Sequence, residues 1–411
     1  LYEGISHQVF NALNFLMPHE ESSRFQFKPT NNIHAYDFYV RAKGEFKDAY
    51  NETKLLEVEQ LFLKALERDR NFELAQAGLC QTYLEQYSLK MGAQIFDLAR
   101  QACQKVNNQS NVKAESELAL GRLYFESGKY SLAKRHFTKA LELKPNNSLG
   151  LIGLAQSFTR LGRAKQGEHY YLKAILAEPG YWKNYEKYGF FLFNSGRYFE
   201  ASLQFNKQSV LQTNSEEAFN NLAAAYYLNT EFDKATQSWR KALSIKSSAN
   251  IYSNLGTSLF FASQFTQAVE MYQQAVNLSP NNYIFRGNLA DALKYAGDQQ
   301  VMSLQQYEAA LNLARQNETI NASDQTIKSN IARYHSELDN CQEANKQSEQ
   351  LVLEQPDDPY IYYDLALAAN NCSSDSDVLL YLNKTLTLGY PNKLLRKDHQ
   401  FKKFQQQILQ W

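Results

Sequence analysis

The sequence is poor in proline, glycine and cysteine, has no net charge and contains no long hydrophobic run. Its 411 residues include only 8 prolines and 17 glycines, which suits a helical chain because both residues disfavour helix interiors. Lysine and arginine number 43, as do aspartate and glutamate, so no overall field attracts nucleic acid or an anionic membrane. No stretch approaches about 18 consecutive apolar residues, so we expect no direct membrane insertion by this part of the chain.

Motifs that support catalysis or cofactor binding are also missing. The sequence contains no glycine-rich phosphate-binding loop and no Gly-x-Ser-x-Gly nucleophile motif. Its seven histidines are scattered, and none belongs to a His-Glu-x-x-His zinc motif. We therefore expect no catalytic residues, no metal site and no cofactor, and the sequence indicates that this part of the chain is not an enzyme.

What the sequence does contain is a regular period of aromatic residues. The intervals are 34, 34, 34 and 33 residues, and small residues keep the same period four positions earlier. The five aromatic residues are Phe137, Tyr171, Phe205, Trp239 and Tyr272. A period of this length indicates stacked helical hairpins, none of which can bury its apolar face without a neighbour. We predict an all-α fold, an α-α superhelix of about ten helical hairpins.

The clearest repeat lies at residues 113–147. Its first helix is expected to end at a glycine, which accepts the left-handed conformation without strain, and a proline follows its second helix. The pattern residues are Leu120, Gly121, Tyr124, Gly128, Ala133, Phe137, Ala140 and Pro145. They match the tetratricopeptide repeat at every offset, and the chain resembles this family over roughly residues 34–388, in five regular and five degenerate repeats.

The resemblance also predicts the domain organisation. Residues 1–33 lack the repeat and are expected to form a short amphipathic helix and a linker. Residues 34–316 hold about eight repeats, and residues 317–388 hold two degenerate ones. The polar stretch at 317–325 is expected to be a hinge or a long loop. Residues 389–411 are expected to cap the stack with a polar outer face.

The family resemblance implies a ligand site on the concave face, which the first helices of the hairpins line. Positions two and five residues after the leucine of each Leu-Gly pair, with their neighbours, are expected to be exposed there. The candidates are Arg122, Phe125, Gln156, Arg160, Phe190, Phe193, Asn194, Asn220, Tyr227, Phe260, Asp291 and Lys294. Such an apolar groove with polar positions suits an extended or helical peptide, or a partner protein. The alternative is that the aromatic side chains pack against neighbouring first helices.

The four cysteines fall into two pairs. Cys80 and Cys103 occupy packing positions in one hairpin and are expected to be buried thiols. Cys341 and Cys372 fall near the turns of adjacent repeats, which line up along one edge of a stack. A disulfide between this second pair is sterically plausible and would imply an oxidising compartment. The alternative is two unrelated thiols.

Three short segments resemble a narrower group. Asn32–Arg41, Glu73–Leu79 and Leu388–Pro391 are similar to the C-terminal tetratricopeptide region of bacterial membrane-spanning signalling proteins, namely winged-helix regulators, receptor Ser/Thr kinases and nucleotide cyclases. The resemblance implies a periplasmic or extracytoplasmic sensor or interaction region, and a chain that starts without methionine is expected to be a fragment. The alternatives are a cytoplasmic location, a free-standing assembly adaptor or chaperone, and a repeat region attached to an enzyme such as a glycosyltransferase. A homo-oligomer is also compatible with the sequence.

Overall fold

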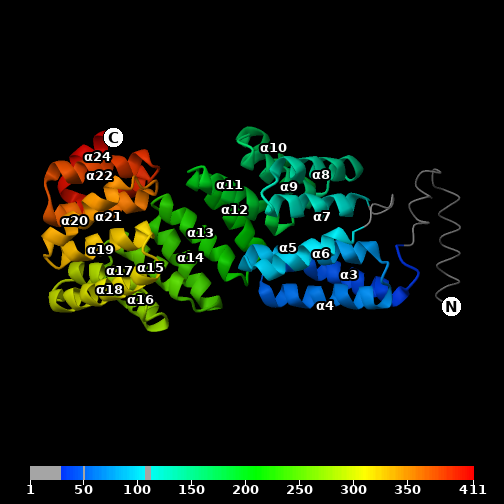
Figure 1. The fold of residues 1–411 in the computed structure, drawn as a ribbon, viewed down its shortest axis with the longest axis horizontal. Coiled ribbons are helices and arrows are strands. Elements are labelled where there is room, and N and C mark those ends of the chain that lie inside the picture. The colour runs from blue at the N-terminus through cyan, green and yellow to red at the C-terminus, as the bar shows by residue number, and fades with distance from the viewer. Residues whose placement is uncertain (1–28, 50, 107–112) are drawn as a thin grey trace. The chain divides into compact units, whose positions relative to one another are not determined.

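A computed structural model describes residues 29–49, 51–106 and 113–411. Within these ranges the regular elements are all helices, without any strand, and they pair into ten hairpins (Figure 1). The prediction of an all-α stack of about ten hairpins is therefore confirmed. The chain divides into two compact units, the N-terminal unit (residues 1–187) and the C-terminal unit (residues 188–411), and the boundary falls within the helix α11.

The hairpins follow one another along the chain without long insertions. They are α3–α4 (Ile33–Asp48, Glu52–Arg68), α5–α6 (Glu73–Lys90, Ala93–Gln104), α7–α8 (Lys113–Glu126, Tyr130–Leu143), α9–α10 (Ser148–Arg160, Ala164–Ala177), α11–α12 (Trp182–Asn194, Tyr198–Leu211), α13–α14 (Glu216–Leu228, Phe232–Ile245), α15–α16 (Ala249–Phe261, Phe265–Leu278), α17–α18 (Tyr283–Tyr295, Gln300–Ile320), α19–α20 (Gln325–Glu337, Cys341–Leu353) and α21–α22 (Pro359–Cys372, Asp375–Thr387). The C-terminal tail, residues 389–411, adds α23 (Asn392–Leu395), η1 (His399–Phe404) and α24 (Gln405–Gln410).

Three of the five periodic aromatic rings, those of Phe137, Phe205 and Tyr272, lie against glycines of first helices. Phe137 of α8 is 3% exposed. A Cβ added at Gly121 of α7 would lie 2.8 Å from this ring, and one added at Gly153 of α9 would lie 2.3 Å from it. Because such distances are below van der Waals contact, only glycine lets the two helices approach the ring from both sides. Phe205 and Tyr272 stand in the same relation to Gly189 and Gly256.

The polar stretch at 317–325 is mostly helical, which corrects the expectation of a hinge or long loop. Helix α18 runs for 21 residues and ends only at Ile320. Its inner side is held in the core by Ala310, Leu311 and Ala314, which are buried in one cluster with α19. The connection that remains is short, and Asp324 caps the next helix by accepting from the backbone N–H groups of Thr326 and Ile327. The amphipathic helix and most of the linker expected in residues 1–33 lie outside the described residues.

Both cysteine pairs form disulfides, and one of them corrects the sequence prediction. Cys80 and Cys103, expected to be buried thiols, are bonded to each other between α5 and α6, and both are almost fully buried. Their Cα atoms lie 4.9 Å apart, because the two helices of a hairpin approach closely where small residues face each other. Cys341 and Cys372, the pair that the sequence singled out, are also bonded, with a Cα–Cα distance of 5.1 Å.

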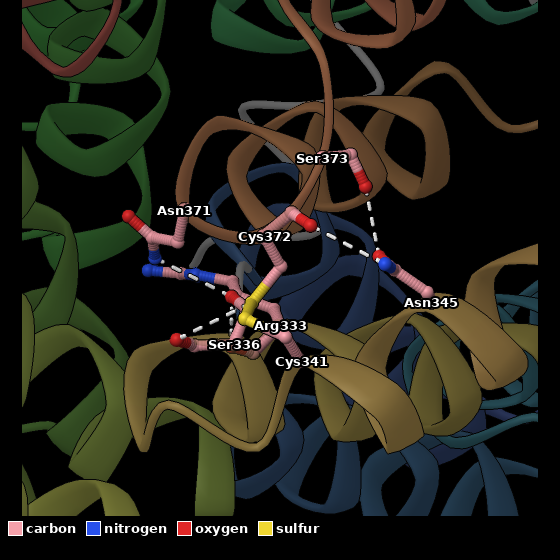
Figure 2. Close-up of a disulfide and its surroundings, with 7 residues drawn as sticks. All are labelled: Arg333, Ser336, Cys341, Asn345, Asn371, Cys372 and Ser373. Carbon is pink, nitrogen blue, oxygen red and sulfur yellow. Dashed lines mark hydrogen bonds between the residues drawn. A yellow bond between two sulfur atoms is a disulfide. The ribbon is translucent and has the colours of Figure 1, made fainter.

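The second disulfide joins the start of α20 to the end of α21, as Figure 2 shows. Hydrogen bonds surround it. The Asn345 side chain donates to the carbonyl of Cys372 and accepts from the Ser373 hydroxyl at 2.8 Å (Figure 2). The Ser336 hydroxyl donates to the carbonyl of Arg333. The bridge therefore ties the ninth hairpin to the tenth at their turns.

Candidate binding cleft

The N-terminal unit has a cleft on its inner face, the face that the first helices of its hairpins form. A wider part of about 280 Å³ lies between α3, α5, α7 and the start of α9. A narrower part of about 40 Å³ continues between α5, α7, α9 and α11. Phe46, Gln81, Leu118 and Leu149 line both parts and therefore join them. Both parts combine apolar side chains with four charged ones, which are Lys43, Lys47, Glu115 and Glu178 in the wider part and Glu85, Arg122, Lys183 and Lys187 in the narrower part.

Contacts of α3 with the start of α11 and with the turn before it close the cleft on one side, although 135 and 131 residues separate the partners. The Trp182 indole N–H donates to the backbone carbonyl of Lys47 at 2.9 Å. The Lys47 ammonium group lies 2.7 Å from a Glu178 carboxylate oxygen. The inner face of this unit is therefore a bounded cleft, which would hold a short segment of a ligand.

Four charged side chains line the narrow end, and three of them are cationic. Glu85 lies 3.1 Å from the Lys183 ammonium and 3.7 Å from the Arg122 guanidinium. Arg122 also lies 2.8 Å from Glu126, and Lys187 lies 2.6 Å from its neighbour Glu186. Burial alone would raise the pKa of Glu85, but Lys183 and Arg122 lower it to about 2. The lining of the narrow end thus holds three cations and one anion, while Glu126 and Glu186, which do not line it, pair with Arg122 and Lys187. An acidic group of a ligand would compete with these carboxylates for the cations.

The structure brings only two of the predicted site residues into this cleft. Arg122 and Gln156 line its narrow end. Phe125 is half-buried against Tyr130, with the ring centroids 5.4 Å apart, and Arg160 is exposed at the last position of α9. Of the four predicted residues in this unit, therefore, two face the cleft and two do not.

The predicted residues of the C-terminal unit are largely engaged with other side chains. Phe190 and Phe193 lie against Phe205, and Asn194 is exposed at the end of α11. The expected exposure fails most clearly at Phe260 and Asp291, which are 4% and 7% exposed. The others have partners within the unit: Asn220 accepts from the Trp239 indole N–H, Tyr227 lies against Trp239 and Phe261, Asp291 pairs with Arg333, and Lys294 pairs with Glu337. Tyr227 and Phe260 contact rings of the neighbouring first helices, Phe261 and Tyr295, which is the alternative given for the aromatic residues. Phe190 and Phe193 instead contact the second helix of their own hairpin.

The cleft also contains residues that the sequence reasoning missed. Gln81 and Glu85 on α5 and Lys183 and Lys187 on α11 are pairs four residues apart, which places each pair on one helix face. Lys183 and Lys187 stand 34 residues after Leu149 and Gly153, which also line the cleft. The period that revealed the aromatic residues could have found Lys183 and Lys187 as well, if the positions one and two helical turns before the predicted Phe190 had also been compared between repeats.

The structure adds two observations on site chemistry. Among the described residues, no group of three histidine, cysteine or acidic side chains is arranged to hold a metal ion. In the same part of the chain, none of the helices combines the length and the apolar character that crossing a bilayer requires.

Comparisons with known proteins point to one repeat family. A curated relative, the small glutamine-rich tetratricopeptide repeat-containing protein 2 of Mycosarcoma maydis, is 29% identical over 119 residues, which make up 29% of this chain and 34% of the relative. The chain thus matches about a third of the length of this relative.

Two solved structures show a distant likeness to this chain. The Cut9–Hcn1 hetero-tetramer of the APC/C has a TM-score of 0.49 and 19% identity, covering 72% of this chain and 55% of that chain. The pilF protein of Pseudomonas aeruginosa has a TM-score of 0.42 and 19% identity, covering 51% of this chain and 93% of that chain. Models of the tetratricopeptide repeat match residues 114–147 in the N-terminal unit and residues 249–282 in the C-terminal unit. The chain is therefore built on tetratricopeptide repeats in both of its units.

Proposed function

We propose that this chain is a protein-interaction scaffold whose N-terminal unit binds a peptide segment in its inner cleft. The observation that carries the proposal is the combination, in one cleft, of apolar side chains along both parts and a narrow end whose lining holds three cations and one anion. The ligand expected from this chemistry is a short segment with apolar side chains next to an acidic side chain or a terminal carboxylate. Binding would add an anion where Arg122, Lys183 and Lys187 already lie around Glu85.

The test is selection of peptides from a random display library on the immobilised full chain. We expect the enriched peptides to combine apolar residues with an acidic group. The variant Gln81→Glu adds a negative charge at the junction of the two parts of the cleft. It should weaken the affinity for the selected peptides about tenfold, which corresponds to about 1.4 kcal/mol. The matched control, Gln166→Glu, changes an exposed residue of α10 and should leave affinity unchanged. Equal binding by both variants would refute the cleft as the site.

The cellular context that we propose is the extracytoplasmic interaction region of a bacterial signalling or regulatory protein. The two disulfides support an oxidising compartment, because such bonds are rare in reducing ones. The resemblance of Asn32–Arg41 and Leu388–Pro391 to that group of proteins supports the signalling role. A free-standing adaptor would use the same cleft. Fusing the chain to a reporter enzyme that is active only outside the cytoplasm would test the location, and an inactive reporter in the native host would count against it.

A further inference from the structure

The C-terminal tail of this chain lies on the inner face of the C-terminal unit. The tail reaches four of the first helices that form this face. Lys393 donates to the Asn229 side chain at the end of α13, and the His399 ring lies 4.5 Å from Phe260 of α15 and 4.9 Å from Tyr295 of α17. Asp398 accepts from the Tyr363 hydroxyl of α21 at 2.7 Å. The sequence predicted a cap with a polar outer face, whereas this segment occupies the place where family members are expected to hold ligands.

Apolar side chains of the tail enter the core of this unit. Five of them are at most 2% exposed and belong to one cluster with residues of α15, α17 and α21. These five are Leu394, Leu395, Phe401, Phe404 and Ile408. The tail therefore presents apolar side chains at the spacing of short helical turns, as a peptide bound in a groove would.

The polar contacts of the tail are of two kinds. In the centre, the buried carboxylate of Asp398 accepts from Tyr363, and the same hydroxyl accepts from the Gln400 side chain at 3.0 Å. At the edge, the ion pair between Lys403 and Asp375 joins side chains that are mostly exposed, and exposed pairs of this kind stabilise little. The specific recognition thus lies at Asp398 and at the apolar side chains.

One position of the tail fits its surroundings poorly. Three aromatic rings enclose the His399 ring, those of Phe260, Phe265 and Tyr295, at centroid distances of 4.5 to 4.9 Å. Its two ring nitrogens are buried and have no hydrogen-bond partner among the described residues. A buried polar group without a partner costs free energy that an apolar side chain of similar size would not. The aromatic pocket would therefore accept an apolar side chain better than it accepts its present occupant.

We propose that the inner face of the C-terminal unit is a second binding groove, whose occupant in this structure, the tail, is exchanged for a segment of a partner protein. The fitting segment has two adjacent leucine-like residues, then an aspartate three residues later followed directly by an apolar residue, and aromatic residues two and five positions after that. This order copies Leu394, Leu395, Asp398, the position of His399, Phe401 and Phe404. The inference does not depend on the cleft of the N-terminal unit.

The experiment uses the full chain with a protease recognition sequence inserted between Leu388 and the exposed Gly389. Before cleavage the linked tail has a local concentration of order millimolar, so an added peptide should not bind. After cleavage, a fluorescent peptide of residues 389–411 should exchange into the groove, as measured by anisotropy. The peptide with His399→Leu should bind roughly tenfold more tightly, because it removes the unpaired buried ring.

Two controls make the result specific. The peptide with Gln406→Leu places the same side chain at an exposed position and should bind like the unmodified peptide. Tyr363→Phe in the cleaved chain removes the hydroxyl that donates to Asp398 and accepts from Gln400. This variant should bind the peptide several-fold more weakly. Loss of folding on cleavage, retention of the tail without exchange, or no gain from His399→Leu would overturn the proposal. A dimer of the uncut chain that exchanges tails would identify a second copy as the occupant and overturn the assignment to a partner protein.

Discussion

At the scale of single residues, room for one aromatic ring decides whether two helices can pack. Gly153 faces Phe137, whereas Gly44 in the middle of α3 has no atom near the position of a Cβ. Both lie in helices, so replacement by alanine improves the helix propensity of each by about 0.5–1 kcal/mol. Only at Gly153 does the new methyl group meet a buried ring.

We therefore expect opposite signs for two identical substitutions. Gly153→Ala should lower the free energy of unfolding of the N-terminal unit by about 1–3 kcal/mol, because the ring of Phe137 cannot move without overpacking its surroundings. Gly44→Ala should raise it by about 0.5–1 kcal/mol. Urea denaturation of the two variants measures both values. Equal effects would show that the contact between ring and glycine does not limit the packing.

The ion pair at the narrow end of the cleft gives a second prediction for single residues. Lys183→Met should destabilise the N-terminal unit by about 2–3 kcal/mol, because it removes the cation nearest to the mostly buried Glu85 and leaves the more distant Arg122 and Lys187. Adding Glu85→Gln should recover most of the loss, since the uncompensated charge disappears. A double-mutant cycle in urea measures the coupling between the two residues. Additive losses would mean that the pair does not act as a unit.

At the scale of elements, the two disulfides hold different junctions. Cys80–Cys103 lies within one hairpin and is almost fully buried, whereas Cys341–Cys372 joins two hairpins and is partly exposed. Each closes a loop of a few tens of residues, so each restricts the unfolded chain by about 3–4 kcal/mol in the loop-entropy description. Their unequal exposure implies unequal access for a reductant.

The two disulfides can be tested by counting free thiols. The denatured, unreduced protein should show no free thiol among its four cysteines, and the pairs should be Cys80–Cys103 and Cys341–Cys372 by peptide mapping. A mild dithiol applied to the folded protein should reduce Cys341–Cys372 first, because solvent reaches it. The double variant Cys341→Ser with Cys372→Ser should lose about 3 kcal/mol in the C-terminal unit. Four free thiols would exclude both bridges and remove the support for an oxidising compartment.

At the scale of the whole molecule, the two units carry buried carboxylates with opposite pKa shifts. In the C-terminal unit, burial raises the pKa of Asp364 and of Asp398 to about 6, although Arg333 and hydrogen bonds oppose the shift. In the N-terminal unit, neighbouring cations lower the pKa of Glu85 to about 2 despite its burial. A raised pKa means that folding favours the protonated form, and a lowered pKa means the reverse.

The units should therefore respond to acid in opposite ways. As the pH falls from 7 towards 4, Asp364 and Asp398 take up protons and should each stabilise the C-terminal unit by up to ~3 kcal/mol. Below about pH 4.5, the unfolded chain takes up a proton at Glu85 while the folded unit keeps this carboxylate ionised, so the N-terminal unit should begin to lose stability. Hydrogen exchange at several pH values, followed separately in each unit, measures both trends. Asp398→Asn should reduce the pH response of the C-terminal unit only, and an unchanged response would contradict the assignment to this carboxylate.

Sequence reasoning reached the contents of the two inner faces only in part. Of its predicted residues, Arg122 and Gln156 line the cleft of the N-terminal unit, because the repeat fixes which side of a first helix faces inward. It missed the contact of Trp182 with Lys47, since this contact joins helices four hairpins apart. It also predicted exposure for Phe260, which the tail covers. A local period cannot report a contact between residues more than a hundred positions apart.

The sequence by itself determined the stack of hairpins, because the 34-residue spacing of rings and small residues leaves each hairpin with an apolar face that only the next hairpin can bury. Tertiary structure alone decided whether the inner face of each unit is open or covered by another segment of the chain. The curvature of each unit brings α3 to α11 and the tail to α15 and α21, and that curvature is the sum of small rotations between hairpins. No single repeat encodes such a sum, so an open cleft in one unit and a filled groove in the other could be seen only in three dimensions.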